Sequence, residues 1–228
     1  MSNFNTISFT ELVHENSACN GACCQNGSVM HENSVPSNGV YIQDVNGNLW
    51  KTDEWDNSVK PNAIAVVADE AKFLIALDES DLELNYSKVA PYGKYMTTIS
   101  DLTSAKSDYD GAGNTANMLK LNPCADFAVG YCDAFVFPDG KTKGFLPSLG
   151  QLNLAYQNKE GIDAALSKCG GIVMKANYYW SSTFWDDSGS IYRHCWGLYW
   201  SDGYIAKGNL DSYHYVRPFA DLLTVNFR

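Results

Sequence analysis

Residues 178–219 read YYWSSTFWDDSGSIYRHCWGLYWSDGYIAKGNLDSYHYVRPF, and this stretch differs in composition from the rest of the chain. It holds 13 of the chain's 30 aromatic residues in 42 positions, including four of the six Trp. The residues between the rings are mostly Ser, Asp, Gly and His. Large rings with small, adaptable polar neighbours are typical of ligand-binding surfaces, and buried rings are equally typical of β cores. Composition alone leaves both interpretations open.

The stretch divides into short strands. We predict strands at 179–182, 195–200, 204–206 and 215–219, because each is rich in aromatic or β-branched residues. The turn Ser201-Asp202-Gly203 joins the middle two strands, since Asp-Gly suits a tight hairpin. Residues 184–194 carry bulky groups without the alternation of a core strand, so we predict a loop there.

The preceding part of the chain predicts two paired strands and then two helices. The apolar runs 63–67 and 72–77 read as central strands, and residues 40–50 read as a hairpin around Asn46-Gly47. We expect a helix over 115–132 that is broken or kinked at Pro123. A second helix begins with a capping box at Ser148 and Gln151, is divided at Gly161, and ends at Gly170-Gly171. We expect the polar, Gly-rich residues 100–114 to form a loop. This order of elements predicts an α+β fold.

Length and charge exclude several function classes. The 228 residues carry a formal net charge of -10, which argues against a nucleic-acid partner because phosphate contacts need clustered Lys and Arg. The apolar runs are too short to span a bilayer, and residues 1–20 lack the features of a signal peptide. Residues 1–60 hold ten Asn and few apolar runs. We therefore divide the chain into a loop-rich attachment or oligomerisation segment at 1–60 and a ligand-binding domain at 61–228.

No motif predicts a metal or a cofactor. The cluster Cys19, Cys23 and Cys24 near His14 and His31 lacks the spacing of a zinc site, so we expect reduced thiols. Asp186-Asp187 with Asp202 is the only acidic group near the aromatic loops, and it cannot supply the six to eight oxygen ligands of calcium.

Catalytic motifs are also missing, so we predict that the protein is not an enzyme. Asp110-Gly-Ala-Gly113 does not complete a dinucleotide-binding fingerprint, and we expect a flexible loop there. Ser181-Ser182 has no nucleophile-elbow context. His194 and Cys195 are neighbours on a predicted strand, so their side chains point to opposite faces.

Several segments, taken together, resemble a known family. They are the apolar runs at 63–77, the helix entry GFLPSLGQL at 144–152, and YWSST at 179–183 followed by YVRPF at 215–219. In this order they are similar to the C-type-lectin-like proteins of phages and bacteria, in particular the variable proteins diversified by diversity-generating retroelements. The resemblance covers about residues 60–220. It implies two helices and a twisted antiparallel sheet that displays a ligand-binding face, behind a small N-terminal appendage. Some members of the wider fold are formylglycine-forming oxidases with paired C-terminal cysteines, but only Cys195 lies in that region here.

In that family, codons for the displayed residues change at adenines, whereas the framework residues stay fixed. The resemblance assigns the framework to Trp180, Ser181, Ser182, Trp196, Trp200, Gly203, Val216, Arg217 and Pro218. It assigns the ligand-binding role to Phe184, Trp185, Asp186, Asp187, Ser190, Tyr192, Arg193, His194, Tyr199, Tyr204, Lys207, Asn209, Asp211, Tyr213 and His214. Trp185 fits the codon pattern least well, because adenine changes in an Asn-like codon do not produce Trp.

The resemblance implies a non-enzymatic receptor- or ligand-binding protein. Without a signal peptide we expect a phage tail-fibre or tail-tip adhesin, on the virion or an extracellular surface, that recognises a bacterial surface protein or glycan. Residues 1–60 would then attach the domain to virion or fibre proteins, and the analogy with fibre tips favours a homotrimer. The alternative is a structural or decorative virion or surface protein that uses the aromatic segment as an assembly interface.

Overall fold

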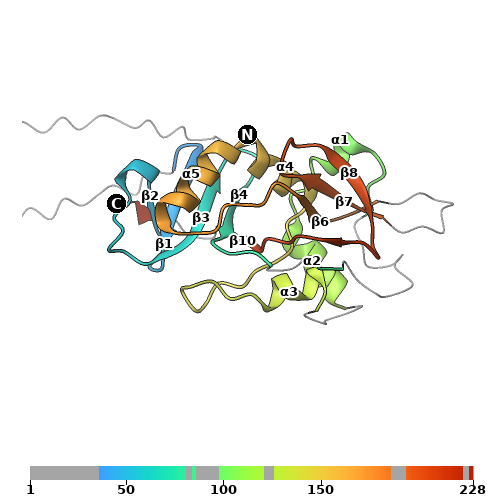
Figure 1. Cartoon of the computed structure of the whole chain (residues 1–228), viewed down its shortest axis with the longest axis horizontal. Coiled ribbons are helices and arrows are strands. Elements are labelled where there is room, and N and C mark those ends of the chain that lie inside the picture. The colour runs from blue at the N-terminus through green and yellow to red at the C-terminus, as the bar shows by residue number, and fades with distance from the viewer. Residues whose placement is uncertain are drawn as a thin grey trace, which may run out of the picture. The chain divides into compact units, whose positions relative to one another are not determined.

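The computed structural model describes residues 36–80, 84–85, 98–120, 126–185, 194–222 and 226–227, which form a mixed α+β fold (Figure 1). Within these ranges there are five α-helices: α1 (Leu102–Ala105), α2 (Gly111–Leu119), α3 (Ala128–Ala134), α4 (Leu149–Gln157) and α5 (Lys159–Cys169). None of the described helices is long and apolar enough to cross a membrane.

The first sheet has six strands in the order β10-β4-β3-β1-β2-β11. They are β1 (Gly39–Asp44), β2 (Asn48–Trp50), β3 (Pro61–Val67), β4 (Lys72–Ala76), β10 (Phe219–Asp221) and β11 (Asn226–Phe227). All neighbours are antiparallel except β11 and β2. The predicted central strands are therefore confirmed as β3 and β4, and the late strands β10 and β11 form the two edges of the sheet.

The predicted hairpin at 40–50 is confirmed as β1 and β2. The Asp44 carboxylate accepts the backbone N–H groups of Asn46 and Asn48 at 2.8 and 3.0 Å, and Gly47 has a φ of 85°, as a tight turn requires. However, β1 pairs with β3 from Gly39↔Val67 to Asp44↔Pro61. The sheet therefore begins before residue 61, and residues 39–50 belong to it rather than to an appendage.

Helix α5 covers one face of this sheet and contacts β1 and β3 (Figure 1). Its apolar side places Ile162 and Leu166 in a buried cluster with Ile64 and Ile75. Helix α4 begins at the predicted capping box of Ser148 and Gln151. Helix α5 ends at the predicted Gly170, which has a left-handed φ of 78°.

Other helix boundaries differ from the prediction, so that five described helices replace the two expected. The break between α4 and α5 is at Asn158 rather than at Gly161, which lies inside α5 and allows it to approach Val40 closely. The helix predicted over 115–132 is divided into α2 and α3; Pro123 itself lies outside the described residues. The loop predicted at 100–114 contains α1 and the start of α2, because Asp101 and Asp110 cap these helices through the N–H groups of Ser104 and Gly113.

The second sheet is formed by the aromatic stretch, with the order β6-β7-β8. Its strands are β6 (Tyr178–Trp185), β7 (His194–Tyr199) and β8 (Ile205–Asn209), and Gly203 forms the predicted turn between β7 and β8 with a φ of 74°. Helices α2 and α3 pack on one face through Met118 and Val129, and α1 and α4 pack on the other through Ala105 and Leu149. A two-stranded pair, β5 (Leu84–Asn85) and β9 (Tyr213–His214), completes the described strands.

A buried ion pair joins the two main sheets. Arg217 donates from Nη2 to Glu79 Oε2 at 2.9 Å and to the Ile172 carbonyl at 2.7 Å, and from Nη1 to the Ala76 carbonyl at 2.9 Å. The hydroxyl of Tyr179 donates to the same Glu79 oxygen at 2.6 Å, and Lys175 Nζ lies 3.3 Å from Glu79 Oε1. Glu79 and Arg217 are 3% and 1% exposed. This network connects three segments: Glu79 follows β4, Ile172 and Lys175 precede β6, and Arg217 precedes β10.

Glu79→Gln should lower the free energy of unfolding by about 3 kcal/mol, because it leaves the buried Arg217 charge without its counter-ion. The matched control is Glu54→Gln, which removes an exposed ion pair with Lys51 and should leave stability unchanged. Urea unfolding followed by circular dichroism measures both. Equal stability of the two variants would show that the buried pair does not hold the sheets together.

Candidate ligand-binding surface

Ten of the fifteen residues predicted to bind ligand lie in the described part of the chain, all within the three-stranded sheet, its turns or β9. The other five lie outside it: Asp186, Asp187, Ser190, Tyr192 and Arg193. The predicted loop at 184–194 is in part strand, since Phe184 and Trp185 end β6 and His194 begins β7.

Phe184 does not belong to the surface, and its prediction as a displayed residue is wrong. Its side chain is 5% exposed and packs with Met118, Val129 and Cys195 in the core under α2 and α3. The Cα of Phe184 is paired with that of Cys195, so both side chains share the covered face of the sheet.

The residues assigned to the framework are mostly interior. Trp180, Ser181, Trp200 and Val216 are fully buried, and Arg217 holds the ion pair described above. Ser181 donates from its hydroxyl to the Trp196 carbonyl at 2.6 Å, across the irregular pairing of β6 with β7. The aromatic stretch therefore supplies core and surface residues at once.

The exposed rings at the β7–β8 turn are Tyr199 and Tyr204, at 38% and 64% exposure. Their ring centres are 6.1 Å apart, and Tyr199 lies 4.9 Å from the buried ring of Tyr178, which in turn lies 4.3 Å from the half-buried His214. We call these four residues the tyrosine surface. The adjacent Tyr213 is 57% exposed on β9.

Close backbone packing holds the tyrosine surface in place. A Cβ atom on Gly197 would lie 2.4 Å from the Tyr178 ring, and one on Gly208 would lie 2.4 Å from Trp180. Only glycine lets these rings lie flat against β7 and β8. The Tyr178 hydroxyl donates to the Ala206 carbonyl at 3.0 Å, and burial raises the pKa of this hydroxyl.

A second group of predicted residues lies on the opposite face of the same sheet. The strand register pairs Trp185 with His194, His194 with Asn209, and Trp196 with Lys207. Lys207 Nζ lies 3.6 Å from the centre of the Trp185 ring and 5.4 Å from that of Trp196. We call Trp185, His194, Lys207 and Asn209 the lysine surface. Alternation along the strands thus divides the predicted residues between two faces.

Two hydrogen bonds fix the rings under Lys207. The indole of Trp185 donates to the Ser100 carbonyl at 3.1 Å, and the indole of Trp196 donates to the Ile99 carbonyl at 2.8 Å. Residues 98–100 run beside β6, and Ile99 donates its N–H to the Phe184 carbonyl at 2.9 Å. The lysine surface therefore has a rigid base.

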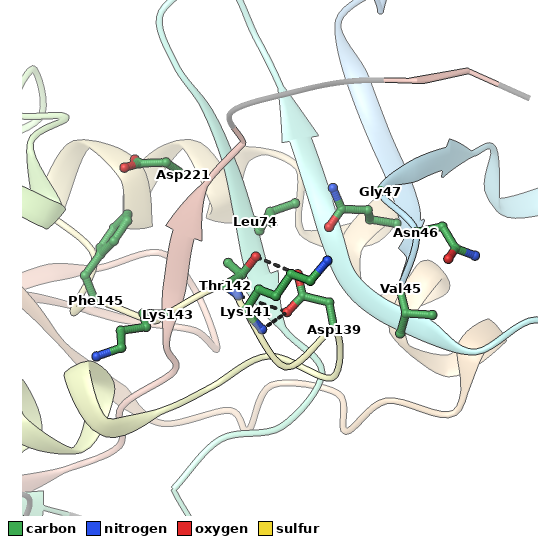
Figure 2. Close-up of a pocket in the computed structure, with 11 residues that line it drawn as sticks. Val45, Asn46, Gly47, Leu74, Asp139, Lys141, Thr142, Lys143, Phe145 and Asp221 are labelled. Atoms are coloured by element: carbon green, nitrogen blue, oxygen red, sulfur yellow. Dashed lines mark hydrogen bonds between the residues drawn. The ribbon is translucent and has the colours of Figure 1, made fainter.

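A separate pocket of about 540 Å³ lies on the six-stranded sheet, and none of the ten described residues of the predicted set lines it (Figure 2). Its lining includes Leu74, Phe145, Lys141, Lys143 and Asp221. Burial, and then the charge of Asp110, raise the pKa of Asp221. Two lysines and two aspartates, counting Asp139, give the pocket no net preference for either charge. Its residues come from four separated segments (43–47, 74, 139–145 and 221), so no sequence motif could have indicated it.

The described residues contain no group of three or more His, Cys, Asp or Glu side chains that could hold a metal ion. Cys195 is buried, and its thiol donates to the carbonyls of Ser181 and Thr183 at 2.9 and 3.0 Å. The cysteine cluster at 19–24 lies outside the described residues. Asp110 to Gly113, predicted to be a flexible loop, forms the capped start of α2 instead.

Comparison of the chain with protein-family models, curated proteins and solved structures gives no match.

The tyrosine surface should be sensitive to acid through His214. Burial lowers the pKa of this imidazole from 6.5 to about 4, so the unfolded chain binds the proton first as the pH falls. The stabilising effect of the neutral ring is complete above pH 6.5 and is lost as the pH approaches 4. Wild type should therefore lose more thermal stability than His214→Phe between about pH 7 and about pH 4.5. Parallel melting curves for the two proteins would contradict this.

Proposed function

We propose that this chain is a non-enzymatic ligand-binding protein that contacts its ligand through the tyrosine surface. The observation that carries the proposal is that Tyr199 and Tyr204 are exposed at the β7–β8 turn, next to the buried rings of Tyr178 and Trp180. Tyrosine rings give a large contact area and lose little conformational entropy on binding, because they have only two side-chain torsions. Ordered exposed rings of this kind are the usual anchors of recognition surfaces.

We further propose the C-type-lectin-like fold of the variable proteins, and a role as a phage tail adhesin that recognises a bacterial surface. Three features support this part of the proposal. The fold is α+β, the segments YWSST and YVRPF lie largely in the interior, and the residues between them include the exposed rings. Multivalent attachment to a fibre would compensate for weak single sites.

Tyr199→Ala and Tyr204→Ala should each weaken binding to cells about tenfold, while the melting temperature stays unchanged. The probe is the fluorescently labelled chain, titrated against intact cells of a panel of bacterial species in flow cytometry. Val136→Ala removes an apolar side chain that is 49% exposed outside the three-stranded sheet, and it serves as the control. Equal losses of binding and thermal stability would instead assign the two tyrosines a packing role.

The same variants separate recognition from assembly. If the tyrosine surface is an assembly interface, Tyr204→Ala should convert the purified oligomer to smaller species in light scattering. If it is a receptor-binding surface, the oligomer should keep its mass while cell binding falls. The first result would favour a structural virion or surface protein.

Diversification of the surface has a genetic test. The DNA flanking this gene should contain a second, imperfect copy of codons 178–219, beside a reverse transcriptase gene and differing almost only at adenines. The differences should fall on exposed positions such as Tyr199, Tyr204 and Asn209, and not on the buried Trp180 or Phe184. The absence of such a copy would remove the diversification proposal and leave a fixed surface.

A further inference from the structure

The lysine surface combines four kinds of side chain on one face of adjacent strands. The aromatic ring is Trp185 on β6, the imidazole is His194 on β7, and Lys207 and Asn209 lie on β8. The Trp185 and His194 rings are 5.4 Å apart. Asn209 Oδ1 accepts the N–H of Asp211 at 3.1 Å, so the Asn209 amide nitrogen is oriented and can donate to a ligand.

In the described part of the chain, the Lys207 ammonium contacts two indole rings and no carboxylate. It lies over the Trp185 ring. The negative face of an indole ring attracts the cation but does not neutralise its charge. A lysine fixed in this way loses less side-chain entropy when it binds an anion than a freely rotating one.

The surroundings restrict which anion can bind. The chain carries a net charge of -10, which repels polyanions such as nucleic acids and sulfated polysaccharides. One fixed cation suits a single carboxylate. The neighbouring amide of Asn209 can donate a hydrogen bond to a hydroxyl group beside that carboxylate, as in a sugar acid.

We propose that the lysine surface is a subsite for an acidic sugar, with Lys207 binding its carboxylate. The inference rests on the ligand-binding function proposed above, and it adds a ligand class and a second contact surface on the other face of the sheet. Lys207, held over the Trp185 ring, donates a charge-assisted hydrogen bond to the sugar carboxylate, and the Asn209 amide donates to a ring hydroxyl.

Two probes that differ at one position test this proposal. Methyl glucuronide carries a carboxylate where methyl glucoside carries a hydroxymethyl group. Titration of the ¹⁵N-labelled chain with the glucuronide should shift the indole N–H signals of Trp185 and Trp196, whereas the glucoside should leave them in place. Lys207→Met keeps an unbranched apolar chain over Trp185 without the charge, and it should weaken glucuronide binding about tenfold or more. The matched control Lys141→Met changes an exposed lysine that lines the separate pocket of Figure 2, and it should bind as wild type does.

Four results would overturn the proposal. They are equal binding of glucoside and glucuronide, equal binding by wild type and Lys207→Met, binding of acetate as tight as that of the glucuronide, and binding of a glutamate-rich peptide without any binding of the glucuronide. The third would reduce the site to a simple anion site, and the fourth would assign it to an acidic protein partner.

The test is separable from that of the proposed function. Tyr204→Ala acts on the opposite face, so it should leave the glucuronide titration unchanged even where it abolishes cell binding. If Tyr204→Ala leaves cell binding unchanged while Lys207→Met loses glucuronide binding, the proposed role of the tyrosine surface is wrong and the acidic-sugar subsite is supported. If Tyr204→Ala weakens cell binding while Lys207→Met binds the glucuronide as wild type does, only the subsite proposal is wrong.

Discussion

The buried ion pair between Glu79 and Arg217 is the constraint on which the rest of the structure depends. Two charges removed from water are costly, and their attraction repays that cost only with good geometry and additional hydrogen bonds. Here Tyr179 and two backbone carbonyls supply hydrogen bonds, and the Lys175 ammonium lies 3.3 Å from Glu79 Oε1. Because the partners follow β4, precede β6 and precede β10, their pairing fixes the position of the three-stranded sheet relative to the six-stranded sheet. The ion pair thereby also fixes the position of the sheet that carries the exposed rings of Tyr199 and Tyr204.

The two surfaces of the small sheet follow from one further constraint, the absence of side chains at Gly197 and Gly208. The rings of Tyr178 and Trp180 occupy the space that their Cβ atoms would take. With that face filled, Tyr199 and Tyr204 continue the row of rings outward into solvent, and His214 packs against its other end. The lysine surface forms on the opposite face because residues 98–100 hold the two indoles there.

The sequence predicted those features that local chemistry decides. The Asn-Gly and Asp-Gly turns, the capping box at Ser148 and the left-handed Gly170 each depend on neighbouring residues alone, and all four are confirmed. Long-range packing decided the rest. Phe184 is buried because α2 and α3 cover its face, and Gly161 continues a helix because Val40 packs against it. The sheet begins before residue 61 because β3 needs β1 as a partner, which no local signal within residues 39–50 indicates.

Strand alternation has a consequence for any ligand that uses the whole predicted set. Successive residues point to opposite faces, so a continuous aromatic stretch cannot form one flat binding surface. The tyrosine surface and the lysine surface lie on opposite faces of the sheet β6-β7-β8, and among the described residues its open edge is β8, because the outer side of β6 bridges to Thr98 and Tyr215. A ligand that contacts both must therefore pass around the edge of β8, and a small ligand can occupy only one of them. A compact sugar at Lys207 and a larger partner at Tyr199 and Tyr204 thus do not compete for the same side chains.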